Sequence, residues 1–249
     1  MNRIGVQLYT VRSLLTSEQQ IRDTLLKIKE IGYDSVQLYD SLHHAKICAY
    51  YAKQAGLAVT SAHSSLEMIR EDFDQYMDLC QCYGIEELGI SNMRGDPEMI
   101  PGFVDGVNSL AAALRDKGLI LSYHNHAVEF LKMPSGKTIM QHYLEGFDPK
   151  TVYFMPDTFW LHYGGADVRH FLELTKGRVN TIHLKDWIFT RKGADFAAVG
   201  QGNLYFEGIL EQAMDLNIRN YVVEQDVCPG DPLESLRQSY NYIRHLIRN

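Results

Sequence analysis

Cysteine, excess basic charge and long apolar runs are all scarce in this sequence. Its four cysteines lack the paired spacing of a zinc finger. Lysine and arginine number 24 against 31 aspartates and glutamates, so the formal net charge is −7, and no basic stripe is present for a nucleic-acid backbone. No run approaches the roughly 20 apolar residues of a membrane span. We therefore expect neither a nucleic-acid partner nor a membrane protein.

Signals of export and of division into domains are missing as well. Met1, Asn2 and Arg3 lead directly into an apolar, strand-like run without the features of a signal peptide, so we expect a cytoplasmic protein with reduced cysteines. No Pro-, Ser- or Gly-rich linker interrupts the pattern. With 45% hydrophobic residues the chain can bury one large core. We expect one domain over residues 1–249, and two small domains are the less favoured alternative.

A repeated unit of helix, glycine and short apolar run dominates the first half of the chain. Helical patterns cover 21–31, 47–55, 73–83 and 104–117, and each is followed by a glycine: Gly32, Gly56, Gly84 and Gly118. Glycine suits this place because a helix C-cap often takes a left-handed conformation that costs a residue with a Cβ more. This alternation is typical of βα units.

Eight apolar or β-branched runs are candidate strands: 4–9, 35–38, 58–60, 87–90, 119–123, 152–156, 179–182 and 221–223. Short helices at 138–144 and 168–174 and a closing helix at 233–247 are expected in the second half. Eight strands with interleaved helices predict a single (β/α)8 TIM barrel, whose usual length matches this chain. An open doubly wound sheet is less favoured, because residues 7–10 do not resemble the glycine-rich phosphate loop that commonly follows its first strand.

The last four runs end in residues that can bind a metal or move a proton. His124 and His126 end the fifth run, and Asp157, His183 and Glu224 end the next three. Parallel barrels collect their chemistry at the carboxyl ends of the strands, so these side chains should meet. Their oxygen and nitrogen donors suit Mn, Zn, Co or Mg, and a cation would compensate the buried carboxylates. Singly, Asp157 could instead cap the next helix and His183 could be a core residue.

Further candidates lie near the same strand ends. Gln7 and Tyr9 on the first strand, His63 after the third, and Gly200-Gln201-Gly202 could contact a polyol, as could Trp160 and Asp186. Tyr9 could equally pack in the barrel, and the two glycines could form only a tight turn.

The chain resembles the sugar phosphate isomerase/epimerase family, the xylose isomerase-like TIM barrels that include an endonuclease IV branch. The likeness rests on ordered segments: Gly5-Val6-Gln7-Leu8-Tyr9-Thr10-Val11-Arg12, Ser61-Ala62-His63, Tyr123-His124-Asn125-His126 with Glu129-Phe130, Asp157-Thr158-Phe159-Trp160, His183-Leu184-Lys185-Asp186 and Gly200-Gln201-Gly202. In the endonuclease branch a histidine stands at the position of Trp160, and no Asp-x-His closely follows His183 here. DNA repair is therefore disfavoured.

The resemblance implies one divalent metal held by Asp157, His183 and Glu224. Family members add a glutamate from the fifth strand, where this chain has His124. Three alternatives stay open: His124 ligates the metal, Glu129 reaches back to replace the glutamate, or the site is metal-free.

We expect an enzyme that isomerises or epimerises a sugar or keto-sugar through an enediolate. Glu224 is the expected base, His126 or Glu129 its partner, and Lys185 an electrophilic or substrate-binding cation. A keto-sugar dehydratase or lyase, such as one acting on a 3-keto-glycoside, begins with the same proton abstraction and is the nearest alternative. A catalytically silent sugar-binding barrel is the third. The expected partner is a small-molecule sugar, and a homo-oligomer stays open.

Overall fold

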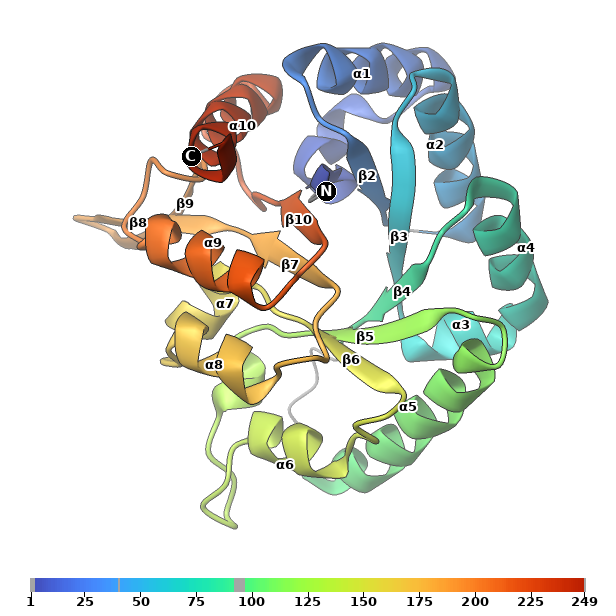
Figure 1. Ribbon diagram of the computed structural model, residues 1–249, viewed down its shortest axis with the longest axis vertical. Helices are drawn as coiled ribbons and strands as arrows, with labels where there is room; N and C mark the ends of the chain where they lie inside the picture. The colour runs from blue at the N-terminus through green and yellow to red at the C-terminus, as the bar shows by residue number, and fades with distance from the viewer. Residues whose placement is uncertain (1–2, 40, 92–96, 249) are drawn as a thin grey trace.

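Eight parallel strands form a ring at the centre of the computed structural model, which describes residues 3–39, 41–91 and 97–248 (Figure 1). They are β1 (Arg3–Gln7), β2 (Ser35–Leu38), β3 (Ala58–Ser64), β4 (Glu87–Ile90), β5 (Ile120–His124), β6 (Val152–Met155), β7 (Thr181–Leu184) and β10 (Asn220–Val223). Their hydrogen-bonded order is β6-β5-β4-β3-β2-β1-β10-β7. The predicted (β/α)8 barrel is confirmed.

The ring closes between β6 and β7 through a few contacts instead of a full ladder. Phe154 N donates to Arg178 O at 2.7 Å, and His183 N donates to Pro156 O at 2.8 Å. Isolated parallel bridges join Phe154 to Val179 and Asp157 to His183. Closure therefore places Asp157 beside His183 at one mouth of the barrel.

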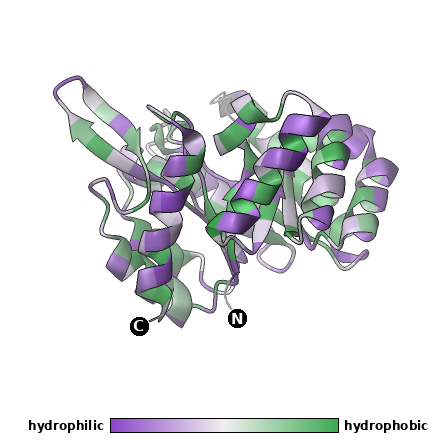
Figure 2. Ribbon diagram, turned by 90° about the horizontal axis from the view of Figure 1, so that it is seen from above, coloured by the Kyte–Doolittle hydropathy of each residue, from purple (hydrophilic) through white to green (hydrophobic). Residues whose placement is uncertain are grey.

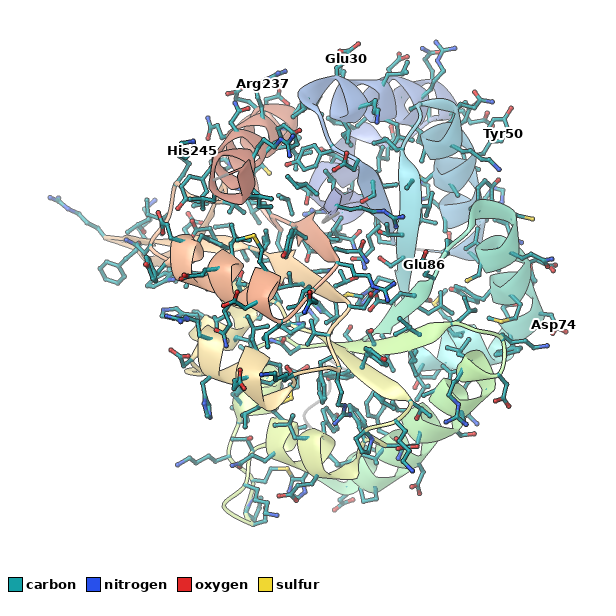
Figure 3. All side chains as sticks on the ribbon, in the orientation of Figure 1. Glu30, Tyr50, Asp74, Glu86, Arg237 and His245 are labelled. Atoms are coloured by element: carbon teal, nitrogen blue, oxygen red, sulfur yellow. The ribbon has the colours of Figure 1, made fainter. Side chains whose placement is uncertain are left out.

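Helices surround the ring, with their polar faces outward and their apolar faces on the strands (Figure 2). They are α1 (Glu18–Ile31), α2 (Leu42–Gln54), α3 (Leu66–Glu71), α4 (Phe73–Tyr83), α5 (Ile100–Arg115), α6 (Ile139–Gly146), α7 (Thr158–Tyr163), α8 (Val168–Leu174), α9 (Phe206–Asp215) and α10 (Pro232–Arg248), with 3₁₀ turns η1 (Leu8–Leu14), η2 (Pro97–Met99) and η3 (Val128–Phe130). Labelled Glu30, Tyr50 and Arg237 project outward from this layer (Figure 3). Within the described residues, no helix combines the length and apolar character needed to cross a bilayer.

The four repeat glycines have positive φ, as the pattern predicted. Gly84, for example, has a φ of 69° and ends α4. Helix starts were predicted less well, because their caps lie outside the apolar pattern. Helix α2 begins at Leu42 instead of residue 47, since Ser41 accepts the backbone N–H of His44 and caps it.

An antiparallel hairpin outside the barrel was not predicted. Strands β8 (Asp186–Thr190) and β9 (Gly193–Ala197) project from the body beside α9 (Figures 1 and 2). At its base, the ring of Phe196 stacks on Phe159 of α7 with centroids 4.5 Å apart. The available signal was the apolar run Trp187-Ile188-Phe189, which is followed by a short polar segment that ends at Gly193.

The bottom of the barrel interior contains a buried carboxylate. Glu87 at the start of β4 is fully buried and accepts hydrogen bonds from Ser122, Asn180 and Thr181. The Asn180 contact measures 2.8 Å. Burial raises the pKa of Glu87 above its ordinary value of 4.5, and the three hydrogen bonds oppose this effect only in part.

This raised pKa predicts how Glu87→Gln changes stability with pH. A carboxyl with a raised folded pKa stabilises the fold fully below its unfolded pKa, and this contribution is lost as pH rises through the folded pKa. Glutamine lacks this titration. The unfolding free energy of Glu87→Gln minus that of wild type should therefore increase from about pH 4 to about pH 8, as measured by urea denaturation. Glu86→Gln, at the exposed neighbouring residue, is the control (Figure 3). A pH-independent difference for Glu87→Gln would contradict the prediction.

Candidate active site

A cavity of about 510 Å³ lies at the carboxyl ends of the strands. Most of the residues proposed from the sequence line it: Gln7, Tyr9, His63, His124, His126, Trp160, His183, Lys185 and Glu224. The other lining residues include Tyr39 after β2, Met68 of α3, Ser91 after β4, and Asp226. Strand ends far apart in the sequence thus share one cavity.

Four buried side chains form a cluster of potential metal ligands, and three of them, His124, His183 and Glu224, line the cavity. His124, Asp157, His183 and Glu224 each offer one donor atom, and these atoms all lie within 4.8 Å of one another. His124 is the last residue of β5, and His183 lies in β7 next to its last residue. Asp157 follows β6, and Glu224 follows β10. We call these four residues the donor cluster.

Asp157 performs two tasks at once. Its Oδ1 accepts the backbone N–H of Trp160 at 2.9 Å and caps α7, while its Oδ2 lies 3.4 Å from His124 Nε2 and faces the donor cluster. The Asp157 backbone N–H donates to Asn125 Oδ1 at 3.0 Å. One oxygen of Asp157 therefore caps the helix, while the other oxygen can act as a metal donor.

The ammonium of Lys185 lies among three carboxylates. Its Nζ is 2.8 Å from Asp226, 3.0 Å from Asp157 and 3.1 Å from Glu224. Although burial alone would lower it, the charges of Asp157, Glu224 and Asp226 raise the pKa of Lys185 above its ordinary value. Lys185 is therefore a permanent cation at neutral pH.

The three carboxylates respond to burial differently. Burial raises the pKa of Asp157 and the pKa of Asp226, and the attraction of Lys185 opposes both shifts. Burial also acts to raise the pKa of Glu224, but the charges of Lys185 and His183 outweigh it and hold this pKa well below its usual range. Glu224 is thus the firmly ionised carboxylate.

Three further imidazoles around the floor are neutral. Burial, followed by the charge of His183, lowers the pKa of His63 to about 3 and the pKa of His124 well below its ordinary value. Burial also lowers the pKa of His126. Neutral rings present lone pairs, which a metal or a proton can use.

The residues present fit a divalent cation. The donor cluster combines two carboxylates with two imidazoles, a mixed oxygen and nitrogen set that can hold a divalent cation, and its imidazoles favour a transition metal over Mg. His124 Nδ1 is buried and has no hydrogen-bond partner within the described part of the chain. When Asp157, Glu224 and Asp226 are all ionised, the single charge of Lys185 leaves two negative charges uncompensated.

Glu129 lies outside the cavity. Its carboxylate is buried, accepts the hydroxyl of Tyr123 at 2.7 Å, and accepts the backbone N–H of His126 at 2.9 Å. Burial raises the pKa of Glu129. The structure therefore places Glu129 behind His126, where it holds the backbone of the fifth-strand segment, and not at the donor cluster.

Asp186 also lies outside the cavity, at the first position of β8 at the base of the hairpin. Its carboxylate accepts four backbone N–H groups, from Trp187, Gly200, Gly202 and Leu204, at 2.8 to 3.2 Å. A Cβ at Gly202 would lie 2.5 Å from Asp186 Oδ1 and 2.2 Å from Trp187 O. The Gly200-Gln201-Gly202 segment therefore wraps the carboxylate as a tight turn.

Asp186→Asn should destabilise the protein because the new amide cannot accept hydrogen bonds on both sides. Its NH₂ group would face backbone N–H donors, and leaving such donors unsatisfied costs about 1–3 kcal/mol. Urea denaturation measures the loss. Asp195→Asn on the exposed part of the hairpin serves as the matched control. Equal stability of the two variants would contradict this role of Asp186.

Two contributors were missed from the sequence. Asp226 follows Glu224 by two residues, and strand-like alternation would have placed both on one side. Gln37 lies in the buried strand β2, and its Oε1 is 2.6 Å from His183 Nε2. A lone amide in an otherwise apolar strand was the signal for it.

Comparison with known proteins assigns the chain to a family. The model of xylose isomerase-like TIM barrels matches residues 25–246, so the chain belongs to this family. The resemblance inferred from the sequence segments is thereby confirmed.

The curated relatives include inosose dehydratases. That of Clostridium perfringens is 29% identical over 159 residues, which cover 56% of this chain and 52% of the relative. That of Geobacillus thermodenitrificans is 26% identical over 159 residues, which cover 57% and 52%. The chain spans about half the length of the curated relatives it matches.

Solved structures share the fold over nearly the whole chain. A sugar phosphate isomerase/epimerase from Parabacteroides distasonis has a TM-score of 0.82 at 21% identity, covering 98% of each chain. A 3-keto-D-glucoside 4-epimerase from E. coli has a TM-score of 0.71 at 17% identity, covering 98% of this chain and 100% of that chain. A xylose isomerase-like TIM barrel protein from Mycobacterium smegmatis, in complex with magnesium, has a TM-score of 0.74 at 15% identity, with coverages of 99% and 97%.

Proposed function

We propose that the protein is an enzyme that removes the proton next to the carbonyl group of a sugar or keto-polyol and returns it to isomerise or epimerise the substrate. One observation carries this proposal: four clustered metal donors, three of which line the cavity, lie together with a fixed ammonium and a neutral imidazole that line it as well. Proton abstraction next to a carbonyl needs an electrophile for the developing oxyanion and a base for the proton. The cavity offers both.

His124, Asp157, His183 and Glu224 would hold one divalent cation. When bound, the cation would polarise the substrate carbonyl and a neighbouring hydroxyl oxygen. Lys185 adds a fixed positive charge at the same floor, and its three carboxylate contacts keep the ammonium in place.

Glu224 and His126 are the proposed proton-transfer pair. The side-chain contacts of Glu224 with His183 and Lys185 both use Oε2, and the residue lines the cavity. His126 lines the same cavity, and burial lowers its pKa, so its ring is free to accept a proton at neutral pH. Glu129 fixes the His126 backbone and acts only as a positioning residue.

The charge of the floor favours an uncharged substrate. Among the described residues that line the cavity, Lys185 is the one lysine or arginine, and its ammonium already contacts three carboxylates, so no free cationic side chain is left for a phosphate group. The rings of Tyr9, Tyr39 and Trp160 on the cavity wall suit the C–H faces of a sugar. We therefore propose an unphosphorylated sugar or cyclic keto-polyol as substrate.

Elimination is the second candidate, and the inosose dehydratases among the relatives favour it. It begins with the same proton abstraction. The electron pair of the broken C–H bond then forms a C=C bond, and the β-hydroxyl group leaves with a proton as water. Product analysis distinguishes this reaction from isomerisation.

Asp157→Asn should weaken divalent-cation binding. Removing a hydrogen-bond partner of a metal ligand typically lowers metal affinity by roughly tenfold or more. Replacing a charged ligand itself should lower the affinity by at least this factor. Calorimetric titration of the chelator-treated protein with Co²⁺ or Mn²⁺ measures this, and wild type should bind one ion. Asp74→Asn, an exposed position on α4, is the matched control (Figure 3). Equal affinities in wild type and Asp157→Asn would contradict the proposed ligand set.

Deuterium exchange tests proton abstraction directly. In D₂O with Mn²⁺ or Co²⁺, the wild-type protein should exchange the proton next to the carbonyl of inosose or a ketose such as D-fructose. Glu224→Gln and His126→Gln should each lower this rate about 100-fold or more. The exposed variant His245→Gln is the control (Figure 3).

The same assay separates the rival functions. Loss of water from the substrate identifies the dehydratase, and a rearranged or inverted product identifies the isomerase or epimerase. D-fructose 6-phosphate should exchange more slowly than D-fructose. Binding without exchange for every unphosphorylated ketose would overturn the enzyme in favour of a sugar-binding barrel.

A further inference from the structure

Two buried glutamines connect the first turn of the chain to the donor cluster. Gln7 of β1 and Gln37 of β2 are register partners in the sheet, and they are 2% and 0% exposed. Gln7 Nε2 donates to Gln37 Oε1 at 2.6 Å, and His183 Nε2 lies 2.6 Å from the same oxygen. The amide oxygen of Gln37 therefore faces both neighbours.

A backbone group fixes the direction of this chain of hydrogen bonds. The N–H of Tyr9 is an obligatory donor, and it donates to Gln7 Oε1 at 3.3 Å as the cap of η1. Gln7 must then turn its NH₂ group toward Gln37. The amide oxygen of Gln37 must then face Gln7, because two NH₂ groups cannot hydrogen-bond each other.

The opposite side of Gln37 does not oppose this orientation. Gln37 Nε2 donates to Ser61 Oγ at 2.8 Å and lies 3.3 Å from Met155 Sδ. A serine hydroxyl can donate or accept, so Ser61 would tolerate either orientation of the amide. Gln7 therefore sets the orientation of the Gln37 amide.

The orientation of the Gln37 amide determines which nitrogen of His183 must carry a hydrogen. An oxygen at Nε2 requires a hydrogen on Nε2, so Nε2 is not available to a cation. Nδ1 lies 2.8 Å from the ionised Glu224 Oε2, to which it donates a hydrogen of its own, and a bound cation would take the place of that hydrogen. The two glutamines thus decide which ring nitrogen is available for a cation.

We propose that Gln7 and Gln37 are positioning residues that keep the hydrogen of His183 on Nε2 and so present Nδ1 to the cation. The inference rests on the proposed function only for the presence of the cation. Partners of this kind typically change metal affinity by about 10- to 100-fold. Gln7, which we had expected to contact substrate, then acts through His183 as well as at the cavity wall.

The test uses the whole chain with ¹⁵N-labelled histidine and reads two quantities. The first is the NMR signal of the His183 Nε2–H, assigned by its absence in His183→Asn. The second is Co²⁺ affinity by calorimetry. In wild type we expect a slowly exchanging Nε2–H that persists in the chelator-treated protein.

Gln37→Leu should lose the protected Nε2–H and bind Co²⁺ about 10- to 100-fold more weakly. Gln7→Met should give the same direction of change, because it frees the Gln37 amide to turn. Gln7→Met also keeps the proposal testable if Gln37→Leu fails to fold. Ser61→Ala removes one hydrogen bond from the same amide and should leave the Nε2–H in place, which makes it the matched control. Gln37→Glu presents an oxygen in either orientation and should retain the Nε2–H.

A wild-type Nε2–H signal in both Gln37→Leu and Gln7→Met would overturn the proposal. An equal loss in Ser61→Ala would also overturn it, because the effect would then be general loosening of the barrel. If wild type binds no Co²⁺, the metal part of the proposed function fails, while the ring-proton signals still decide the role of the two glutamines.

Discussion

Closure of the parallel ring is the constraint on which the site depends. The contacts between β6 and β7 are few, yet they include the bridge from Asp157 to His183. On the other side of β7, the backbone N–H of Glu224 donates to Leu184 O at 3.1 Å and continues the register of β10. Three residues separated by dozens of positions in the chain therefore become neighbours through backbone geometry alone.

This geometry brings several carboxylates together in a buried place, where their negative charges must be compensated. Carboxylates taken out of water need counter-charges, and removing one partner from a buried pair costs about 3–5 kcal/mol. Lys185 meets part of this demand through three carboxylate contacts. The remaining negative charge is what makes the floor suited to a divalent cation. The backbone N–H of Trp160 and the amide of Gln37 contact Asp157 and His183 from behind.

Much of the architecture was predictable from local pattern. Buried strands appear as continuous apolar runs. Glycines such as Gly84 mark the helix ends because glycine, which lacks a Cβ, adopts a positive φ at little energetic cost. The hairpin β8–β9 was missed because its residues follow the polar end of β7 and belong to no βα unit. Helix starts were displaced where a serine cap such as Ser41 lies beyond the apolar pattern.

Strand periodicity and strand-end chemistry are local properties, so the barrel and the segments that bear its chemistry could be predicted before the fold was known. The partners of these side chains were set by the folded structure. It placed Lys185 among Asp157, Glu224 and Asp226, bound the Asp186 carboxylate to the backbone of residues 200–204, placed Glu129 behind His126 and joined Gln37 to His183. These assignments depend on side-chain direction and on distances between strands that are remote in the chain, and no local pattern encodes either.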